Sequence, residues 1–318
     1  MMSCERKNRG LILFWCAALF LAQTAEAVAQ RRAGPLYLAP PQGVAILRVD
    51  WSRTREDSEL RKVVRAYEFE RVVSQVGLES REIAEWVVFS DLKPTGATGQ
   101  GVILRGHFDS RRVAGTLRER GWGEESYRAR PVYVHPSDGT RLSFAAPGLI
   151  AFGSKTGVEG VLDTQAAPHS GLARTKPFST VLADLERDPS PISFVIGIPE
   201  KYQAVADLAY KVATKLMDVA GLGILGMVMD KIGLVRALGF AVTHSGRTLP
   251  VKLLALMPSE SSAGMVSGTL NLLQGMGQGL LAGRIPSSQQ EMLRSLSVTQ
   301  SGALLSIRIS ISESDLPR

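Results

Sequence analysis

Val113-Ala114-Gly115-Thr116-Leu117 returns, slightly altered, as Val266-Ser267-Gly268-Thr269-Leu270, 153 residues further along this 318-residue chain. In the same way Leu142-Ser143-Phe144 returns as Leu296-Ser297-Val298, at an offset of 154 residues. Two separate motifs that recur at nearly one offset indicate an internal repeat. The sequence therefore predicts a tandem duplication of one folding unit.

The length and the turn-rich residues at the centre set the expected boundaries. About 290 residues remain after an export signal, which suits two domains. Pro168 and Gly171, followed by Asp188-Pro189-Ser190-Pro191, interrupt the chain near its middle. The predicted organisation is a signal peptide over residues 1–29, a first α+β repeat over 38–170, a linker over 171–190 and a second α+β repeat over 185–318.

Hydrophobic periodicity predicts the same order of elements in both halves. In the first half we expect strands at 44–50, 85–90, 102–108, 132–135, 141–145 and 149–152, with helices at 56–76, 109–121 and 153–163. In the second half we expect strands at 192–198, 238–244, 250–257 and 304–311, with helices at 200–218 and from Ser259 onward. The predicted fold class is α+β, a tandem duplication of a mostly antiparallel sheet with helices on one face. The order β-α-β-β-α-β-β is ferredoxin-like in style, which concerns architecture only.

The first 29 residues have the three parts of an export signal. Basic residues come first, an apolar run of about twelve residues follows, and small residues close the segment at Ala25, Ala27 and Ala29. The run is too short to span a bilayer, which takes roughly 20 residues. Cleavage after Ala27 and cleavage after Ala29 both fit. We expect a periplasmic or extracellular protein, with an uncleaved signal anchor as the alternative.

Cysteine usage and charge exclude several classes of function. Cys4 and Cys16 both lie in the signal, so the mature chain is cysteine-free and can form neither a disulfide nor a thiolate site. The net charge is +7 over the whole chain, and acidic residues are interspersed among the basic ones. A nucleic-acid-binding protein would concentrate basic residues on one face, so no nucleic-acid partner is expected. Contact with an anionic membrane surface stays open.

The two predicted repeats differ on one face of a central strand. In the first repeat Arg105 and His107 alternate with apolar residues, whereas Leu254 and Leu256 take these places in the second. A strand that is apolar on both sides is rarely left in water. We therefore expect this face of strand 250–257 to be covered or to contact a partner.

Two stretches of the second repeat, 219–229 and 261–283, carry no charged residue. The later stretch has glycines mostly four residues apart, which would give a helix a smooth stripe that permits close approach of another helix. These segments are either ordinary core or the lining of an apolar surface for a lipid-like ligand or a partner protein. The predicted surface comprises Leu254, Leu256, Met227, Met229, Gly268, Gly275 and Gly279.

No motif in the chain names a reaction, and no catalytic, cofactor-binding or metal-binding residues are predicted. Gly221-Leu222-Gly223-Ile224-Leu225-Gly226 matches a dinucleotide-binding pattern, but neither a preceding strand nor a following acidic residue accompanies it. The chain has four histidines, and no two of them have the spacing of ligands on one helix face. His107 with Asp109 and Ser110 suggests a hydrolase, but Asp109 is better placed as a helix cap.

The predicted function is an exported, non-catalytic binding or envelope-associated protein whose second repeat presents an apolar surface to a lipid-like ligand or a partner protein. One alternative is a hydrolase-type enzyme with its site between the repeats. A cleft that brings together two or more of His107, His135, His244, Asp138 and Asp230 would favour it. The other alternative is a structural component of the cell envelope.

Overall fold

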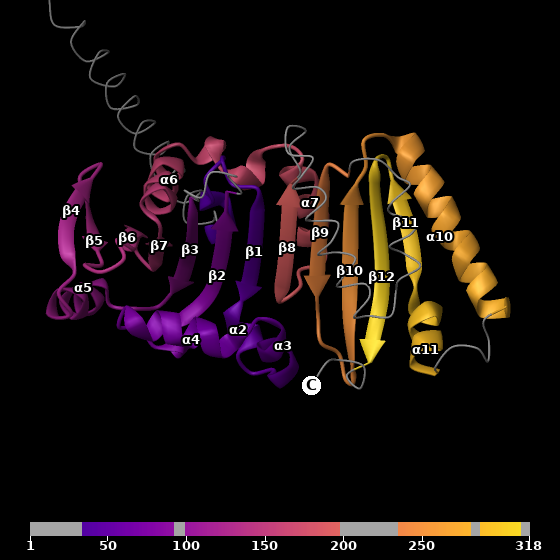
Figure 1. Ribbon diagram of the computed structural model, residues 1–318, viewed down its shortest axis with the longest axis horizontal. Coiled ribbons are helices and arrows are strands. Elements are labelled where there is room, and N and C mark those ends of the chain that lie inside the picture. Colours follow the sequence, from indigo (N-terminus) through magenta and orange to yellow (C-terminus); the bar gives the residue numbers. More distant parts are fainter. Residues whose placement is uncertain (1–33, 92–98, 198–234, 281–286, 313–318) are drawn as a thin grey trace, which may run out of the picture.

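The computed structural model describes residues 34–91, 99–197, 235–280 and 287–312. Within these residues twelve strands form a single sheet in the order β11-β12-β10-β9-β8-β1-β2-β3-β7-β6-β5-β4, and Figure 1 shows them in one row with helix α10 at the β11 end. Every neighbouring pair is antiparallel. The chain therefore has the expected α+β class. The predicted signal, helix 200–218, Met227, Met229 and Asp230 lie outside the described residues.

The first half begins with a 3-10 turn, η1 (Pro35–Leu38), and ends with helix α6. Its strands are β1 (Ala45–Asp50), β2 (Ile83–Ser90), β3 (Gln100–Gly106), β4 (Gly123–Tyr127), β5 (Arg130–Val134), β6 (Arg141–Ala146) and β7 (Leu149–Gly153). Its helices are α2 (Trp51–Thr54), α3 (Ser58–Val63), α4 (Ala66–Gln75), η2 (Ser80–Glu82), α5 (Ser110–Glu119) and α6 (Lys155–Ala166).

The second half follows short turns η3 (Pro168–Ser170) and η4 (Leu172–Arg174). Its strands are β8 (Ile192–Gly197), β9 (Ala237–Val242), β10 (Thr248–Leu256), β11 (Ser297–Ser301) and β12 (Leu304–Ser312). Its helices are α7 (Phe178–Glu186), α10 (Glu260–Leu280) and α11 (Ser287–Ser295).

Strands β1 and β8 join the two halves into one sheet. Val49 lies opposite Ile192 and Ala45 opposite Ile196, so five consecutive residues of β1 pair with β8. The other neighbour of β1 is β2, which is also antiparallel to it. In the ferredoxin-like order, the first strand of a repeat has the third strand of that repeat as a parallel neighbour. Both neighbours of β1 are antiparallel to it, so the strand order in this sheet is not ferredoxin-like. Antiparallel pairing of the two halves satisfies a strand edge that each half would otherwise expose.

The strand order proceeds outward from the β1–β8 pair in a similar way on both sides. The repeated pentapeptides lie on α5 and α10, and Val113, Leu117, Val266 and Leu270 are all at most 2% exposed. The second repeated motif lies on β6 in one half and at the start of β11 in the other. Gly148 and Gly302 occupy the turns that follow, with φ of 72° and 57°, a conformation that favours glycine.

Helices cover both faces of the sheet, which corrects the expectation of helices on one face. One hydrophobic cluster packs η1, α6, η4 and α7 on one face, and it includes Leu254. Two further clusters occupy the opposite face, one under α2 to α5 and one under α10 and α11; Phe240 contacts both of these. The physical reason is the alternation in β10, where Val251 and Ala255 face α10 while Leu254 faces α7. Both sides of this strand are apolar and both need cover.

Several local elements differ from the sequence-based expectation, among them α2 and α11, which were not predicted. The helix expected over 56–76 is broken into α3 and α4, because Arg65 adopts a left-handed conformation with φ of 50° between them. Strand β4 (Gly123–Tyr127) was not predicted, since its first four residues are exposed and none of these is a large hydrophobic residue. The residues predicted as a linker, 171–190, contain α7, whose Phe178 and Val181 are buried against the sheet.

Candidate functional site

Helix α10 begins at a sequence that caps it well. The backbone N–H of Ser262 donates to Oγ of Ser259 at 3.1 Å, and Glu260 lies in the first turn, where a negative charge suits the helix dipole. The helix continues for 21 residues, and residues 261–280 carry no charge. It lies at the β11 end of the sheet and contacts β11, β12 and α11 (Figure 1).

One face of α10 anchors it to the sheet. Ala263, Val266 and Leu270 are each at most 2% exposed, and they belong to a cluster with residues of α11, β10 and β12. Two glutamines fix the helix further, since Nε2 of Gln274 donates to the carbonyl of Leu296 at 2.7 Å and Nε2 of Gln300 donates to the carbonyl of Glu260 at 3.0 Å. These contacts determine which side of α10 is left facing outward.

The outward face of α10 carries a stripe that we call the α10 seam: Met265, Gly268, Leu272 and Gly275. Met265 is 69% exposed and Leu272 is 64% exposed, and both glycines are exposed with no atom within 4 Å of where a Cβ would lie. The spacing of three, four and three residues places all four on one side of the helix. The described residues contain four exposed large hydrophobic side chains, of which two lie on this seam. The seam is therefore an apolar ridge with two depressions.

The glycines of the seam make the helix costly to form. Each glycine in a helix interior is less favourable than alanine by about 1 kcal/mol. Gly264 contacts Gln300, because a Cβ there would lie 3.4 Å from Oε1, so packing against β11 accounts for that glycine. Among the described residues Gly268 and Gly275 have no such contact, and the packing of this part of the chain does not explain them.

The structure separates the residues that were predicted to share one surface. Gly268 and Gly275 lie on the seam, and the backbone of Gly279 belongs to the same helix. Leu254 is 1% exposed, and with the partly buried Leu256 it packs on the opposite face of the sheet, in the cluster that contains α7. The expectation that this face is covered is met by a helix of the chain itself, so Leu254 offers no open surface.

Sequence reasoning did not single out Leu272 at all. The signal was present, because Met265, Gly268, Leu272, Gly275 and Gly279 follow the alternating spacing of three and four residues that marks one helix face. The four-residue spacing of the glycines includes Gly264, which lies at the edge of this side of the helix and contacts Gln300 of β11, and it leaves Leu272 out. The buried positions Val266 and Leu270 identify the outward side only when the sheet is in place.

The histidines do not converge on one site in the described residues. His107 follows β3, His135 follows β5 and His244 follows β9. Nδ1 of His135 lies 3.0 Å from Asp138, but this pair lies on the exposed turn between β5 and β6. The N–H of Thr140 donates to Asp138 and, with His135, lowers the pKa of that carboxyl. Asp138 therefore stabilises a hairpin turn.

A second histidine–carboxylate pair spans the two halves. Nδ1 of His244 lies 2.5 Å from Oδ2 of Asp57, and both side chains are about one fifth exposed. Burial alone would raise the pKa of Asp57, but hydrogen bonds from the Leu60 N–H and from His244 outweigh it and lower the pKa below its usual value. The same carboxylate caps α3, accepting from Glu59 and Leu60 at 3.0 Å. This pair fastens the first helices to the loop after β9.

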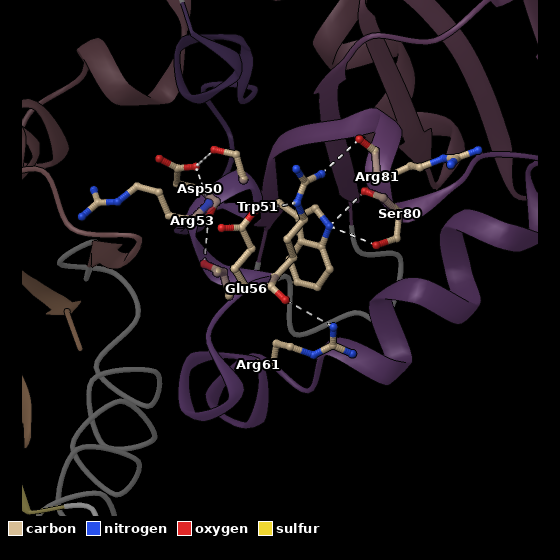
Figure 2. A network of polar contacts seen from close by, with 10 residues as sticks. Asp50, Trp51, Arg53, Glu56, Arg61, Ser80 and Arg81 are labelled. Carbon is tan, nitrogen blue, oxygen red and sulfur yellow. Dashed lines mark hydrogen bonds and ion pairs between the residues drawn. The ribbon is translucent and has the colours of Figure 1, made fainter. Parts of the chain in front are cut away.

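Polar contacts around α2 join it to neighbouring parts of the first half, as Figure 2 shows. Nε1 of the fully buried Trp51 donates to the carbonyl of Ser80 at 3.0 Å and to its hydroxyl at 3.2 Å. Asp50 caps α2, and its own N–H donates to the carbonyl of Pro191 at 2.7 Å. Arg53 donates to the carbonyl of Pro189 at 3.2 Å. The hydrogen bonds to Pro189 and Pro191 hold α2 against the segment before β8, and those to Ser80 hold Trp51 in the core.

A small hollow of about 180 Å³ lies where β9 ends, β10 begins and β12 ends. Its two cations are already compensated, because Lys252 pairs with Asp184 at 2.7 Å and Arg308 with Asp188 at 3.5 Å. Pockets for small organic ligands usually have 300–1,000 Å³. It is lined by Ser190, Ala241, Thr243, Pro250, Val251, Lys252, Ser295, Arg308, Ile309 and Ser310.

No group of three or more His, Cys, Asp or Glu side chains in the part of the chain that the structure describes is arranged to hold a metal ion. Of the helices in the described ranges, none combines the length and the apolarity that crossing a bilayer requires.

Comparisons with known proteins give distant structural similarities. No family model matches the chain, and no curated protein matches its sequence. Crystal form I of TP0453 aligns over 89% of this chain and 94% of that chain, with 11% identity and a TM-score of 0.46. Form IV aligns over 90% and 96%, with 11% identity and a TM-score of 0.45, and form III over 89% and 96%, with 11% identity and a TM-score of 0.42.

Proposed function

We propose that this chain is an exported, non-catalytic binding protein that docks a helix of a partner protein against the α10 seam. The observation that carries the proposal is the exposure of Met265 and Leu272, at 69% and 64%, on a helix with no charged residue from 261 to 280. Isolated exposed apolar residues need no explanation, but an apolar stripe along an uncharged helix is typical of an interaction site.

The proposal includes a duplication, after which the second unit acquired this surface. At the offset of 153 residues, Arg112 corresponds to Met265 and Glu119 to Leu272. Both residues of α5 are exposed, and Arg112 forms an ion pair with Glu82 at 2.6 Å. Charged residues on α5 are thus replaced by apolar residues at matching places on α10. This exchange supports a function specific to the second half.

The chemistry of α10 favours a protein helix over a lipid surface as the partner. Helices that lie on membranes are rich in Lys and Arg on their polar face, and residues 261–280 contain neither. Glycine depressions beside large apolar side chains permit a second helix to approach closely. A lipid-like ligand would need an enclosed pocket, whereas the seam is a convex ridge.

A photo-crosslinking experiment tests the docking surface. Benzoylphenylalanine replaces Asn271, an exposed residue beside the seam, in the full chain expressed in the native host, and crosslinked products are resolved by mass. We expect one discrete adduct, lost when Met265→Arg and Leu272→Glu restore the charges of α5. The matched control places the same photo-crosslinker at Arg118, which corresponds to Asn271 on α5 at the offset of 153 residues and is likewise exposed.

The outcomes of this experiment separate clearly. An adduct from position 271 that disappears with the charged variant supports docking at the seam. Absence of any adduct at 271, or equal adducts from positions 271 and 118, would contradict the proposal. Circular dichroism of the charged variant must match that of the unaltered chain, since exposed positions tolerate such changes within about 0.5 kcal/mol.

Export has its own test. The mass of the chain recovered outside the cytoplasm is expected to correspond to cleavage after Ala27 or after Ala29. Recovery of the uncleaved chain would support the signal-anchor alternative.

A second candidate function is hydrolysis at the contact between the halves, favoured by the His244–Asp57 pair. A carboxylate on Nδ1 orients an imidazole in the way that hydrolases use. Treatment of the purified chain with a fluorophosphonate would label an activated serine. Labelling that His244→Gln abolishes would favour this candidate, and absence of labelling would exclude a serine hydrolase.

A further inference from the structure

We infer that the helix docked on the α10 seam is α10 of a second copy of this chain, arranged antiparallel about a two-fold axis. This inference rests on the proposed docking function and names its partner. It comes from the order of large and small residues along the seam, which fits itself when reversed.

The match follows from the positions of the four seam residues. In an antiparallel pair centred on position 270, residue 268 of one helix lies opposite residue 272 of the other, and residue 265 opposite residue 275. Gly268 then receives Leu272 of the second copy, and Gly275 receives Met265. Two-fold symmetry repeats both contacts, so each large side chain enters a glycine depression and no large residue faces another. A parallel pair in register would instead place Leu272 against Leu272.

Among the described residues, the space needed for these contacts is open. No atom lies within 4 Å of the Cβ position of Gly268 or Gly275, and the two large side chains are about two-thirds exposed. The pairing brings no two charged side chains of α10 close together, because residues 261–280 are uncharged. Antiparallel helix dipoles also attract each other. The pairing accounts for the two glycines that intrachain packing leaves without a role.

The contact area predicts a reversible dimer. A helix of 21 residues is about 31 Å long at 1.5 Å per residue. A single pair of such helices buries less surface than the roughly 1,200 Å² of a stable standard-size interface. We therefore expect the dimer to dissociate on dilution, and its affinity to respond strongly to single changes in the seam.

Complementary variants test the pairing in the full chain. Gly268→Leu places a leucine against Leu272 of the second copy, and Leu272→Ala leaves two small residues facing each other. Each variant alone is expected to weaken dimerisation about 10-fold or more, because overfilling and underfilling both cost contact energy. An equimolar mixture of the two is expected to regain dimers, since each leucine then faces a small residue. Sedimentation velocity over a concentration series measures all three.

Two controls make the pattern specific. Gly115→Leu on α5 adds the same side chain at the corresponding position and should leave dimerisation unchanged. The double variant Gly268→Leu with Leu272→Ala should also pair with itself, because its large and small residues have exchanged places. A partner that is not a second copy would not be restored by this exchange.

The results distinguish failure of the pairing from failure of docking. Recovery in the mixture, with loss in each single variant, supports the antiparallel pair. A chain that stays monomeric at every concentration, or a mixture no tighter than its components, overturns it. If position 271 still crosslinks a different protein in cells, the docking surface stands and only its occupant changes. If position 271 yields no adduct either, the proposed function fails as well.

Discussion

Truncation of Leu254 tests whether the apolar face of β10 is core of the single chain. Leu254 is 1% exposed and packs beneath α7. At Gly239, on the neighbouring strand, a Cβ would come within 2.4 Å of Val181 and 3.1 Å of Leu254, so the surroundings are closely packed. Leu254→Ala is therefore expected to leave a cavity that relaxes little.

The magnitude follows from burial. Truncation of a fully buried leucine costs about 3 to 4 kcal/mol in unfolding free energy, the sum of lost transfer energy and cavity formation. Leu272→Ala deletes the same atoms from a side chain that is 64% exposed in the single chain. Only about a third of its transfer energy is lost, so we expect a cost below about 1 kcal/mol.

Urea unfolding followed by circular dichroism and by tryptophan fluorescence measures both variants at a concentration where the chain is monomeric. Trp51, Trp86 and Trp122 all belong to the first half, whereas Leu254 belongs to the second. Coincident transitions by the two methods indicate that the shared sheet unfolds as one unit. Equal costs for the two variants, or a cost below about 1 kcal/mol for Leu254→Ala, would refute the placement of Leu254 in the core.

Three further predictions concern the scaffold. Asp57→Asn keeps a cap for α3 but removes the charge paired with His244, so we expect the folded chain to lose about 1 kcal/mol of stability. Because the pKa of Asp57 is lowered in the folded chain, this loss should be seen above pH 3.8 and should vanish as the pH falls through the lowered pKa. Unfolding curves from pH 2 to 7 measure the loss. Glu85→Gln should cost about 2 kcal/mol, less at high salt, because this 3% exposed carboxylate bridges two arginines at 2.6 Å each. Gly106→Ala should lower the unfolding free energy by about 3 kcal/mol or more, measured by thermal unfolding, since the added Cβ would lie 2.0 Å from a backbone oxygen. As a control, Gly123→Ala should be close to neutral, because the atom nearest to its added Cβ would be 3.9 Å away.

Local signals in the sequence were sufficient where a structure depends on neighbouring residues. Asp109 caps α5 through the N–H of Arg111, as its position before an apolar periodic segment predicts. The alternation of isoleucines with polar residues predicts β12, whose Ile307 and Ile309 are buried. Helix caps and strand alternation involve groups within a few residues, so a single sequence contains them.

The candidate site could be predicted only in part. The uncharged glycine-containing segment is visible in the sequence, and Gly268 and Gly275 lie on the seam. Leu254 was assigned to the same surface because alternation shows that a face is apolar but not which element covers it. In this chain α7, within the expected linker, provides the cover.

By itself the sequence determined the elements that short-range chemistry controls: the capped helices, the hairpins, the alternating strands and the uncharged character of α10. Tertiary structure alone decided that β1 pairs with β8, that helices cover both faces of the sheet, and that Met265 and Leu272 face outward. The physical reason is that strand pairing and burial join residues more than a hundred positions apart. Which apolar side chains find cover therefore depends on how distant elements pack, while the residues themselves show only that cover is needed.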